Sequence, residues 1–432
     1  MSKNNLQRAK GVRDFLPQEK IARNKIVDLL QEVFELYGYN PIETPVLERY
    51  ETFASKYGIG QESDAMQETF KLKDQGNRDL VLRTEFTVPF ARFVGMNPQL
   101  KMPFKRYQMG SVFRDGPIKL GRYREFWQCD VDVVGIKKMT IDAEIINLTR
   151  KIFNKLDINI DIQLNSRKLL NDILLKAQIN QDKQESIIVS IDKLDKIGSS
   201  GVGKELEEKG VTKKQIKTIL DLINISGTNQ EKIDFLEKEL SQSEGLTEIK
   251  TIFALVDSRD MIFLPSLARG LAYYTGTIFE VFLKDKSKLS SSLAGGGRYD
   301  NMIGGFLEKK EQIPAIGISF GLETIFDALQ IQKSNLVAES AISKAYISAI
   351  GNNLEKEALK LAEDLRNNSI RVDLDLQSKN LRKNLDYADS YGINWVIILG
   401  EDEIKQGKYT LRNMKTGQQQ LLSLNDIIKE LT

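Results

Sequence analysis

The sequence predicts a mixed α/β protein with more than one domain, and three observations support this. Segments with strand patterns lie on both sides of a helix-rich stretch, residues 164–255, in which Lys, Gln, Glu, Ile and Leu dominate. Beyond a polar stretch at residues 334–344, short strands alternate with helices. The length of 432 residues is enough for two or three domains with a large buried core.

These patterns divide the chain into five segments. Residues 1–163 and 256–333 are predicted to form the two parts of one domain, and residues 164–255 a helical insertion between them. Residues 334–344 are predicted to be a linker, and residues 345–432 a C-terminal α/β domain.

The first domain is predicted to begin with a helix over residues 18–37, because its apolar residues recur with helical spacing and Gly38 suits the position after a helix. Residues 39–46 read as extended, and Pro41 and Pro45 favour an edge strand or a subunit contact there. Further predicted elements are a strand at 80–83, a helix at 87–96, strands at 261–264 and 274–283, a glycine turn at 295–300, a strand-to-helix junction at 314–321 and a helix from Leu322.

The C-terminal region is predicted to be an α/β domain of about 90 residues. It carries 12 Lys and Arg against 13 Asp and Glu from residue 345 onward, so no general attraction for nucleic acid follows. Lys379, Arg382 and Lys383 form a local basic cluster at the start of a predicted helix. Phosphate contacts and a solvated helix face explain this cluster about equally well.

The composition excludes several kinds of catalysis. The chain has no histidine, which removes an imidazole general base, Ser–His and Cys–His nucleophile pairs, and histidine-ligated metals. Cys129 is the single cysteine, so no disulfide and no thiolate metal cluster forms within the chain. An enzyme with this composition works by positioning, by charge stabilisation, or through a base that the substrate supplies.

The same composition predicts a cytoplasmic protein. The first ten residues are polar and lack the apolar core of a signal peptide, and the sequence contains no run of 18 apolar residues. A single thiol suits a reducing compartment.

The most informative stretch is residues 121–132, which read GRYREFWQCDVD. With the upstream segment that ends at Phe113 and Arg114, it predicts a β-hairpin whose loop carries Arg114 and Arg122. Alternation along the return strand places Phe126, Gln128, Asp130 and Asp132 on one face. A ring, an amide and a carboxylate under two guanidinium groups predict a site for a nucleotide beside a small cationic or amino-bearing ligand. The alternative, an exposed strand with solvated charges, explains the whole set less well.

Two other segments carry candidate site residues. Glu85 and Thr87 lie two apart at a strand end, where they could hold an ammonium group; alternatively, Thr87 is the cap of the following helix. Residues 269–276 read RGLAYYTG, and Arg269 precedes a glycine that permits close backbone approach to a ligand. Tyr273 and Tyr274 follow and are predicted to begin a strand that lines the site.

These segments, in this order, resemble the class II aminoacyl-tRNA synthetases and, among them, the histidyl-tRNA synthetases. The resemblance runs from residue 11 to the C-terminus. Residues 39–47 resemble the family's motif 1, residues 106–135 its motif 2, and residues 314–325 its motif 3. Residues 269–276 resemble the histidine-specific signature.

The resemblance implies a mainly antiparallel class II catalytic sheet flanked by helices, a homodimer, and an anticodon-binding domain after residue 340. It implies L-histidine, ATP and tRNA-His as substrates, Mg²⁺ bound with ATP, and no metal held by the protein. The implied roles are as follows: the α-amino group on Glu85, Thr87 and Gln128; the imidazole on Asp132 and Tyr274, beside Tyr273; the carboxylate and α-phosphate on Arg114 and Arg269; the distal phosphates on Arg122; adenine on Phe126. Arg114, Arg269 and Gln128 are the implied catalytic residues.

Three positions depart from the family pattern. Thr324 stands where motif 3 usually has arginine, Ala272 where the signature usually has aspartate, and Asp115 lies one residue, not two, after the motif 2 arginine. Two alternatives to a synthetase stay open. One is a histidine-binding regulatory paralogue such as the ATP phosphoribosyltransferase regulatory subunit, and the other is an RNA-binding accessory protein.

Overall fold

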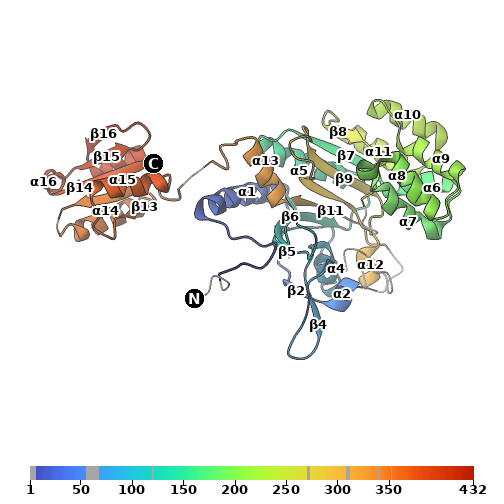
Figure 1. The fold of residues 1–432 in the computed structure, drawn as a ribbon, viewed down its shortest axis with the longest axis horizontal. Coiled ribbons are helices and arrows are strands. Elements are labelled where there is room, and N and C mark those ends of the chain that lie inside the picture. Colours follow the sequence, from blue (N-terminus) through green and yellow to red (C-terminus); the bar gives the residue numbers. More distant parts are fainter. Residues whose placement is uncertain are drawn as a thin grey trace. The chain divides into compact units, whose positions relative to one another are not determined.

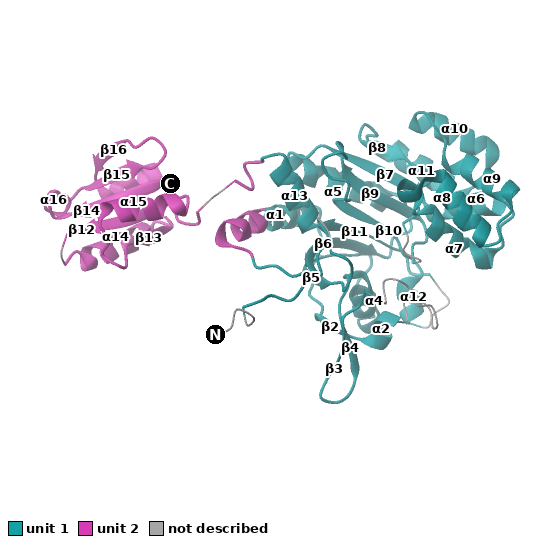
Figure 2. Cartoon of the chain, in the orientation of Figure 1, with its two compact units in different colours: residues 1–14, 26–333 teal, residues 15–25, 334–432 magenta. Residues whose placement is uncertain are grey.

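The structure is a computed structural model, which describes residues 6–54, 68–118, 121–269, 273–307, 312–338, 341–351 and 353–432 (Figure 1). The chain divides into two compact units (Figure 2). The first comprises residues 1–14 and 26–333, and the second comprises residues 15–25 and 334–432.

An eight-stranded sheet forms the centre of the first unit. Its six inner strands pair antiparallel, and the edge strands β1 and β8 pair parallel with their neighbours. The prediction of a mainly antiparallel sheet is therefore confirmed, and Pro41 lies at an edge as expected. In spatial order the strands are β1 (Asn40–Pro41), β5 (Phe104–Phe113), β6 (Glu125–Val134), β11 (Ala315–Gly321), β10 (Ala294–Arg298), β9 (Thr277–Leu283), β7 (Ile160–Ser166) and β8 (Met261–Phe263).

One face of this sheet is apolar and is covered by helices. Phe320 of β11 places its ring 5.8 Å from that of Phe34 in α1 (Pro17–Leu36) and 6.1 Å from that of Phe153 in α5 (Thr140–Lys155). Cys129 of β6 pairs with Phe320 and is fully buried on the same face. Burying these side chains contributes about 1.5–3 kcal/mol for each large residue.

Two sequence predictions about β9 and β10 are wrong. Gly295, Gly296 and Gly297 lie in strand β10 and do not form a turn. A Cβ on Gly296 would lie 2.0 Å from the carbonyl oxygen of Gly317, so the glycine run reflects close strand packing. The strand predicted from Tyr274 begins at Thr277, so the two tyrosines precede it.

A small three-stranded sheet lies in the same unit, in the order β2 (Leu47–Arg49), β4 (Asp79–Leu82), β3 (Lys71–Lys73). It packs with α2 (Tyr50–Ala54), α4 (Thr87–Met96) and α12 (Met302–Phe306) around a core that includes Phe53, Val81 and Phe90. The predicted helix at residues 87–96 matches α4 in full.

Residues 167–255, which belong to the predicted insertion, form mainly helices, and strand β7, which was not predicted, extends into its predicted start. Thr212 and Thr228 each form a capping box that begins a helix. The insertion consists of α6 (Arg167–Lys176), α7 (Gln181–Ile191), α8 (Leu194–Glu208), α9 (Lys213–Ile223), α10 (Asn229–Glu239) and α11 (Glu244–Leu255), and α13 (Leu322–Ile331) follows later, directly after β11.

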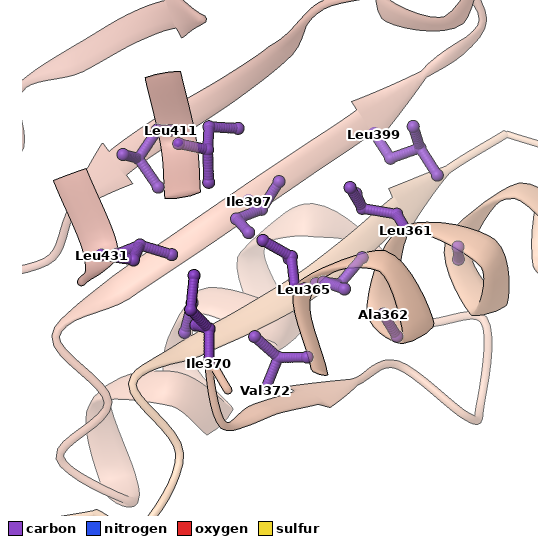
Figure 3. Close-up of a cluster of buried hydrophobic side chains, with 13 residues drawn as sticks. Leu361, Ala362, Leu365, Ile370, Val372, Ile397, Leu399, Leu411 and Leu431 are labelled. Carbon is purple, nitrogen blue, oxygen red and sulfur yellow. The ribbon is translucent and has the colours of Figure 1, made fainter. Parts of the chain in front are cut away.

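The second unit contains a five-stranded sheet in the order β13-β12-β14-β15-β16, parallel across its first three strands. Its core joins Leu361 and Leu365 of one helix to Ile397 and Leu399 of the central strand (Figure 3). The predicted strand–helix alternation is confirmed. The elements are β12 (Ala345–Ile350), α14 (Glu355–Asn367), β13 (Val372–Leu374), α15 (Leu381–Ser390), β14 (Trp395–Gly400), α16 (Glu401–Gln406), β15 (Tyr409–Asn413), β16 (Gln419–Leu422) and α17 (Leu424–Leu431).

No helix in the described ranges combines the length and the apolar character that a membrane crossing requires.

Candidate active site

The second face of the large sheet is polar. Gln128, Asp130 and Asp132 alternate with the apolar residues of β6 and therefore lie on the face opposite Cys129. In the neighbouring strand β11, Gly317 pairs with Asp132 and Gly321 pairs with Gln128. Because a Cβ on Gly317 would lie 2.0 Å from Oδ1 of Asp132, glycine is what lets this carboxylate lie over β11.

Asp132 is held by two buried groups. Its Oδ2 lies 2.5 Å from Nη2 of Arg106, which is opposite it in the β5–β6 hairpin, and its Oδ1 accepts a hydrogen bond from the hydroxyl of Tyr299. Burial raises the pKa of Asp132, and the Arg106 guanidinium and the Tyr299 hydroxyl act in the opposite direction. The carboxylate is thus fixed in one orientation.

A row of aromatic rings leads from Asp132 toward Arg269. Tyr299 makes an edge contact with Tyr273 at 6.3 Å between ring centroids, and Tyr273 lies 4.6 Å from Tyr274. The Arg269 guanidinium lies 5.6 Å from the Tyr274 ring and 3.5 Å from a carboxylate oxygen of Glu280. Arg269 has a positive φ of 44°, an uncommon backbone conformation for a residue with a side chain.

Glu85 lies before helix α4 and caps its N-terminus with its side chain. Its carboxylate accepts hydrogen bonds from the backbone N–H groups of Thr87 at 2.5 Å and Val88 at 3.0 Å. The alternative prediction that Thr87 caps this helix is wrong, because Thr87 is its first residue and the capping oxygens belong to Glu85. Glu85 is buried, and its charge contributes to the raised pKa values of Asp132 and Tyr273, in which burial is the larger cause.

The predicted hairpin is confirmed, with Phe113 of β5 paired to Glu125 of β6. At its tip, Nε of Arg114 donates to the carbonyl of Thr84 at 3.0 Å, and the guanidinium lies 5.0 Å from the Phe126 ring. Arg114 is thereby placed beside Glu85. Arg122 is about half exposed and pairs with Glu68 at 3.3 Å.

Two buried acceptors on the polar face have no donor. Oε1 of Gln128 and Oδ1 of Asp130 have no hydrogen-bond partner among the described residues. Burial raises the pKa of Asp130 to about 8, against the attraction of Arg106 and with the repulsion of Asp132. The side chain of Ser319 hydrogen-bonds to this carboxyl group, but a buried oxygen left without a donor is costly to a fold, which makes this position a candidate for function.

Comparison with known proteins identifies the family. A family model described as histidyl-tRNA synthetase matches residues 11–325. This chain belongs to the histidyl-tRNA synthetase family. A second model, described as an anticodon binding domain, matches residues 344–432.

Relatives cover the chain from end to end. Histidine–tRNA ligase 1 of Bacillus cereus is 41% identical over 433 residues, which cover 99% of each protein. Histidine–tRNA ligase of Finegoldia magna is 36% identical and covers 98% of each. The crystal structure of histidyl-tRNA synthetase from Nostoc sp. PCC 7120 superposes with a TM-score of 0.84 at 29% identity and covers 99% of both chains.

A structure from Bacillus halodurans, described as an ATP phosphoribosyltransferase regulatory subunit/histidyl-tRNA synthetase, also shares the fold. It has a TM-score of 0.76, is 23% identical, and covers 93% of this chain and 100% of its own. This likeness concerns the fold alone. The curated relatives do not favour the regulatory alternative, since they are named histidine–tRNA ligases.

In this member of the histidyl-tRNA synthetase family, the site residues expected from the sequence fall into two groups along the polar face. Glu85, Thr87, Arg114 and Phe126 lie where the hairpin tip meets α4, and Asp132, Tyr273, Tyr274 and Arg269 follow the aromatic row. Gln128 lies two residues from Phe126 on the same strand face. Lys379, Arg382 and Lys383 belong to the other unit.

The three departures from the family pattern differ in what surrounds them. Thr324 is buried, and its hydroxyl donates to the carbonyl of Gly321 at 3.0 Å, so it offers no charge to a nucleotide. Asp115 pairs with Arg124 at 2.9 Å and is thus part of the loop structure. Ala272 lies outside the described residues.

Two residues that position Asp132, Arg106 and Tyr299, were not predicted from the sequence. Arg106 could have been found by counting the hairpin register, since it lies directly opposite Asp132. Tyr299 follows strand β10, and its hydroxyl donates a hydrogen bond to Asp132. No local sequence pattern predicts this contact.

Proposed function

We propose that this protein is a histidine–tRNA ligase. It activates L-histidine with ATP to histidyl-adenylate, releases pyrophosphate, and transfers the histidyl group to the 3′ end of tRNA-His. The observation that carries this proposal is the Asp132 carboxylate held by Tyr299, whose ring contacts Tyr273 and so leads to Tyr274, on the same sheet face as Gln128.

In this proposal the amino acid lies along the polar face. Asp132 accepts a hydrogen bond from the imidazole, and Tyr274, beside Tyr273, borders the ring. Glu85, Thr87 and Gln128 bind the α-ammonium group. A site built from buried hydrogen-bonding groups rejects apolar analogues of similar size by about 10⁴–10⁵, because those groups would be left unpaired.

The nucleotide lies toward the hairpin tip. Arg114 and Arg269 bind the reacting carboxylate and the α-phosphate, Arg122 binds the distal phosphates, and Phe126 stacks on adenine. Arg122 reaches the phosphates by exchanging its weak, exposed pair with Glu68 for a phosphate contact.

The chemistry needs no histidine in the protein. In the first step an oxygen of the substrate carboxylate attacks the α-phosphorus, the bond to the bridging oxygen breaks, and pyrophosphate leaves. In the second step a ribose hydroxyl of the tRNA attacks the activated carbonyl, a non-bridging phosphate oxygen accepts the hydroxyl proton, and AMP leaves. The side chains contribute position and charge stabilisation.

Mg²⁺ enters this proposal as the counter-ion of the ATP phosphates, because magnesium is commonly bound through substrate phosphates. Within the described ranges, no group of three or more His, Cys, Asp or Glu side chains could hold a metal ion. We further propose a cytoplasmic homodimer in which residues 1–163 and 256–333 are the catalytic domain, 164–255 its insertion, 334–344 a linker, and 345–432 bind the anticodon. Sedimentation velocity tests the dimer.

ATP–pyrophosphate exchange, with and without L-histidine, tests the proposed function. We expect exchange that requires histidine. Binding of histidine without exchange would instead support the regulatory paralogue, and absence of both would support the RNA-binding accessory protein.

Two arginine variants test whether the proposed reaction takes place at the hairpin tip. Arg114→Gln removes one charge at the hairpin tip, and we expect the exchange rate to fall about 100- to 1,000-fold. Arg78→Gln removes an exposed arginine that pairs with Asp74 in the β3–β4 turn, and we expect it to leave exchange unchanged. Equal rates for the two variants would contradict the proposed role of Arg114.

A further inference from the structure

Asp130 is a buried carboxyl group that the roles above do not use. It lies between Gln128 and Asp132 on the polar face of β6, and 4% of its surface is exposed. Its Oδ1 has no hydrogen-bond partner within the described part of the chain, and the same is true of Oε1 of Gln128. Two buried acceptors two residues apart on one strand face form a place at which a ligand can supply donors.

Neither guanidinium group near Asp130 donates a hydrogen bond to its Oδ1. Arg106 forms its ion pair with Asp132, and its Nε and Nη1 have no hydrogen-bond partner among the described residues. Arg83 donates to the carbonyls of Ser111 at 2.9 Å and Thr44 at 2.7 Å, so its guanidinium is committed to the backbone.

The groups that face Asp130 leave a surplus of carboxyl groups. Asp132 on the same strand and Glu85 before α4 both repel its charge, Arg106 attracts it, and the side chain of Ser319, its partner residue in β11, forms a hydrogen bond with it. A cation with several N–H groups is the ligand chemistry that complements this surplus.

We propose that Asp130 is a further substrate-binding residue, whose carboxylate accepts a hydrogen bond from the α-ammonium group of the amino-acid substrate. This inference rests on the proposed function. The ammonium carries three donors, enough for Asp130, Gln128 and Glu85 together. In the free protein, burial favours the protonated form of Asp130, and the bound cation displaces that proton.

The proton displacement follows from the pKa of Asp130, which burial raises to about 8 in the free protein. At pH 7 most of the free protein therefore carries a protonated Asp130, whereas a neighbouring ammonium favours the ionised form. Histidine binding is thus coupled to release of up to one proton.

Calorimetric titration of the full chain tests this with two ligands, L-histidine and imidazolepropionate, which is histidine without its amino group. In two buffers of different ionisation enthalpy at pH 7, we expect proton release with histidine and none with imidazolepropionate. The wild-type protein alone decides this point, so it does not depend on any variant folding.

Asp130→Asn tests the contact directly. We expect its affinity for histidine to fall about tenfold or more, since a charge-assisted hydrogen bond is lost, while its affinity for imidazolepropionate stays unchanged. Glu125→Gln, which removes a carboxylate from the other face of the same strand, serves as the matched control and should bind both ligands as the wild type does.

The outcomes separate this inference from the proposed function. A wild-type protein that fails to bind histidine overturns the proposed function. A wild-type protein that binds histidine without releasing a proton, or an Asp130→Asn variant that loses both ligands equally or neither, overturns the role of Asp130 alone.

Discussion

At the scale of the residue, Asp130 combines a buried position with a missing donor, and the free energy of that arrangement depends on pH. Its pKa is about 8 in the folded chain and about 3.9 in an unfolded one. A raised pKa favours the protonated form, so the contribution of this group to stability is fully present below pH ~4 and is lost as pH rises through 8.

We therefore predict that Asp130→Asn gains stability relative to the wild type as pH rises from 5 to 8.5, because asparagine has no charge to bury. The thermal midpoint should move by about 2–4 °C for each kcal/mol. The chain has two tryptophans, Trp127 in the first unit and Trp395 in the second, so a Trp395→Phe background lets Trp127 report on the first unit alone. A difference between the variants that stays constant over this range would contradict the prediction.

At the scale of the element, glycines decide which side chains can lie over the sheet. Gly317 pairs with Asp132 across β6 and β11, and Gly297 pairs with Gly317 from β10. A Cβ on Gly297 would lie 2.9 Å from the Tyr274 ring. The glycines of these two strands thus make room for the carboxylate and the ring between which the imidazole is proposed to bind.

Gly317→Ala is predicted to displace Asp132, because the added Cβ would lie 2.0 Å from Oδ1 of the carboxylate and 2.8 Å from the carbonyl of Val131. We expect KM for histidine in pyrophosphate exchange to rise about tenfold or more, with a smaller change in KM for ATP. Gly305→Ala is the control, since nothing lies within 4 Å of its added Cβ. Matching KM values for the two variants would count against this account.

A buried ion pair between Arg298 and Asp142 also connects strand β10 to helix α5. Asp142 is fully buried, and both its oxygens accept hydrogen bonds from Arg298, which also donates to the carbonyls of Ile136 and Lys138. Removing the charge of Asp142 leaves Arg298 buried with only its long pair to Asp300, at 3.9 Å.

Asp142→Asn is therefore predicted to lower the free energy of unfolding by about 3–5 kcal/mol. Asp79→Asn removes one partner of the exposed Lys73–Asp79 pair and should cost between zero and about 1 kcal/mol. Urea unfolding in the Trp395→Phe background measures both changes. Similar losses for the two variants would show that the Asp142–Arg298 pair does not hold the fold as described.

At the scale of the whole molecule, the two units have separate cores and separate proposed tasks. Residues 345–432 of the second unit carry 12 Lys and Arg against 13 Asp and Glu, so any attraction of this region for tRNA must come from local clusters. In the helix α15 region, Lys379 lies 5.4 Å from the Tyr387 ring, and Arg382 and Lys383 are exposed in the first turn.

Changing Lys379, Arg382 and Lys383 together to Glu is predicted to weaken aminoacylation of tRNA-His and to leave pyrophosphate exchange unchanged, because exchange needs no tRNA. A matched triple change of Lys356, Lys360 and Lys405, which are exposed on α14 and α16, should leave both reactions nearly unchanged. Unaltered aminoacylation in the first triple variant would place the tRNA contacts elsewhere.

The sequence by itself determined the fold class, the hairpin and the family, because hydrophobic periodicity and the order of motifs are local signals. It also identified Asp132, Tyr273 and Tyr274 as candidates, although not what holds them. Periodicity could not show that Gly295, Gly296 and Gly297 form a strand, since only the close approach of β11 requires glycine there.

The tertiary structure alone decided how these candidates are arranged. Tyr299 lies 167 positions from Asp132 in the chain, and folding brings its hydroxyl to the carboxylate. The capping of α4 by Glu85 and the lack of a hydrogen-bond donor for Oδ1 of Asp130 likewise depend on which groups other segments supply. The burial, the hydrogen bonds and the pKa of a side chain depend on the groups that pack around it. Those groups come from distant segments of the chain, so these properties arise only in the folded protein.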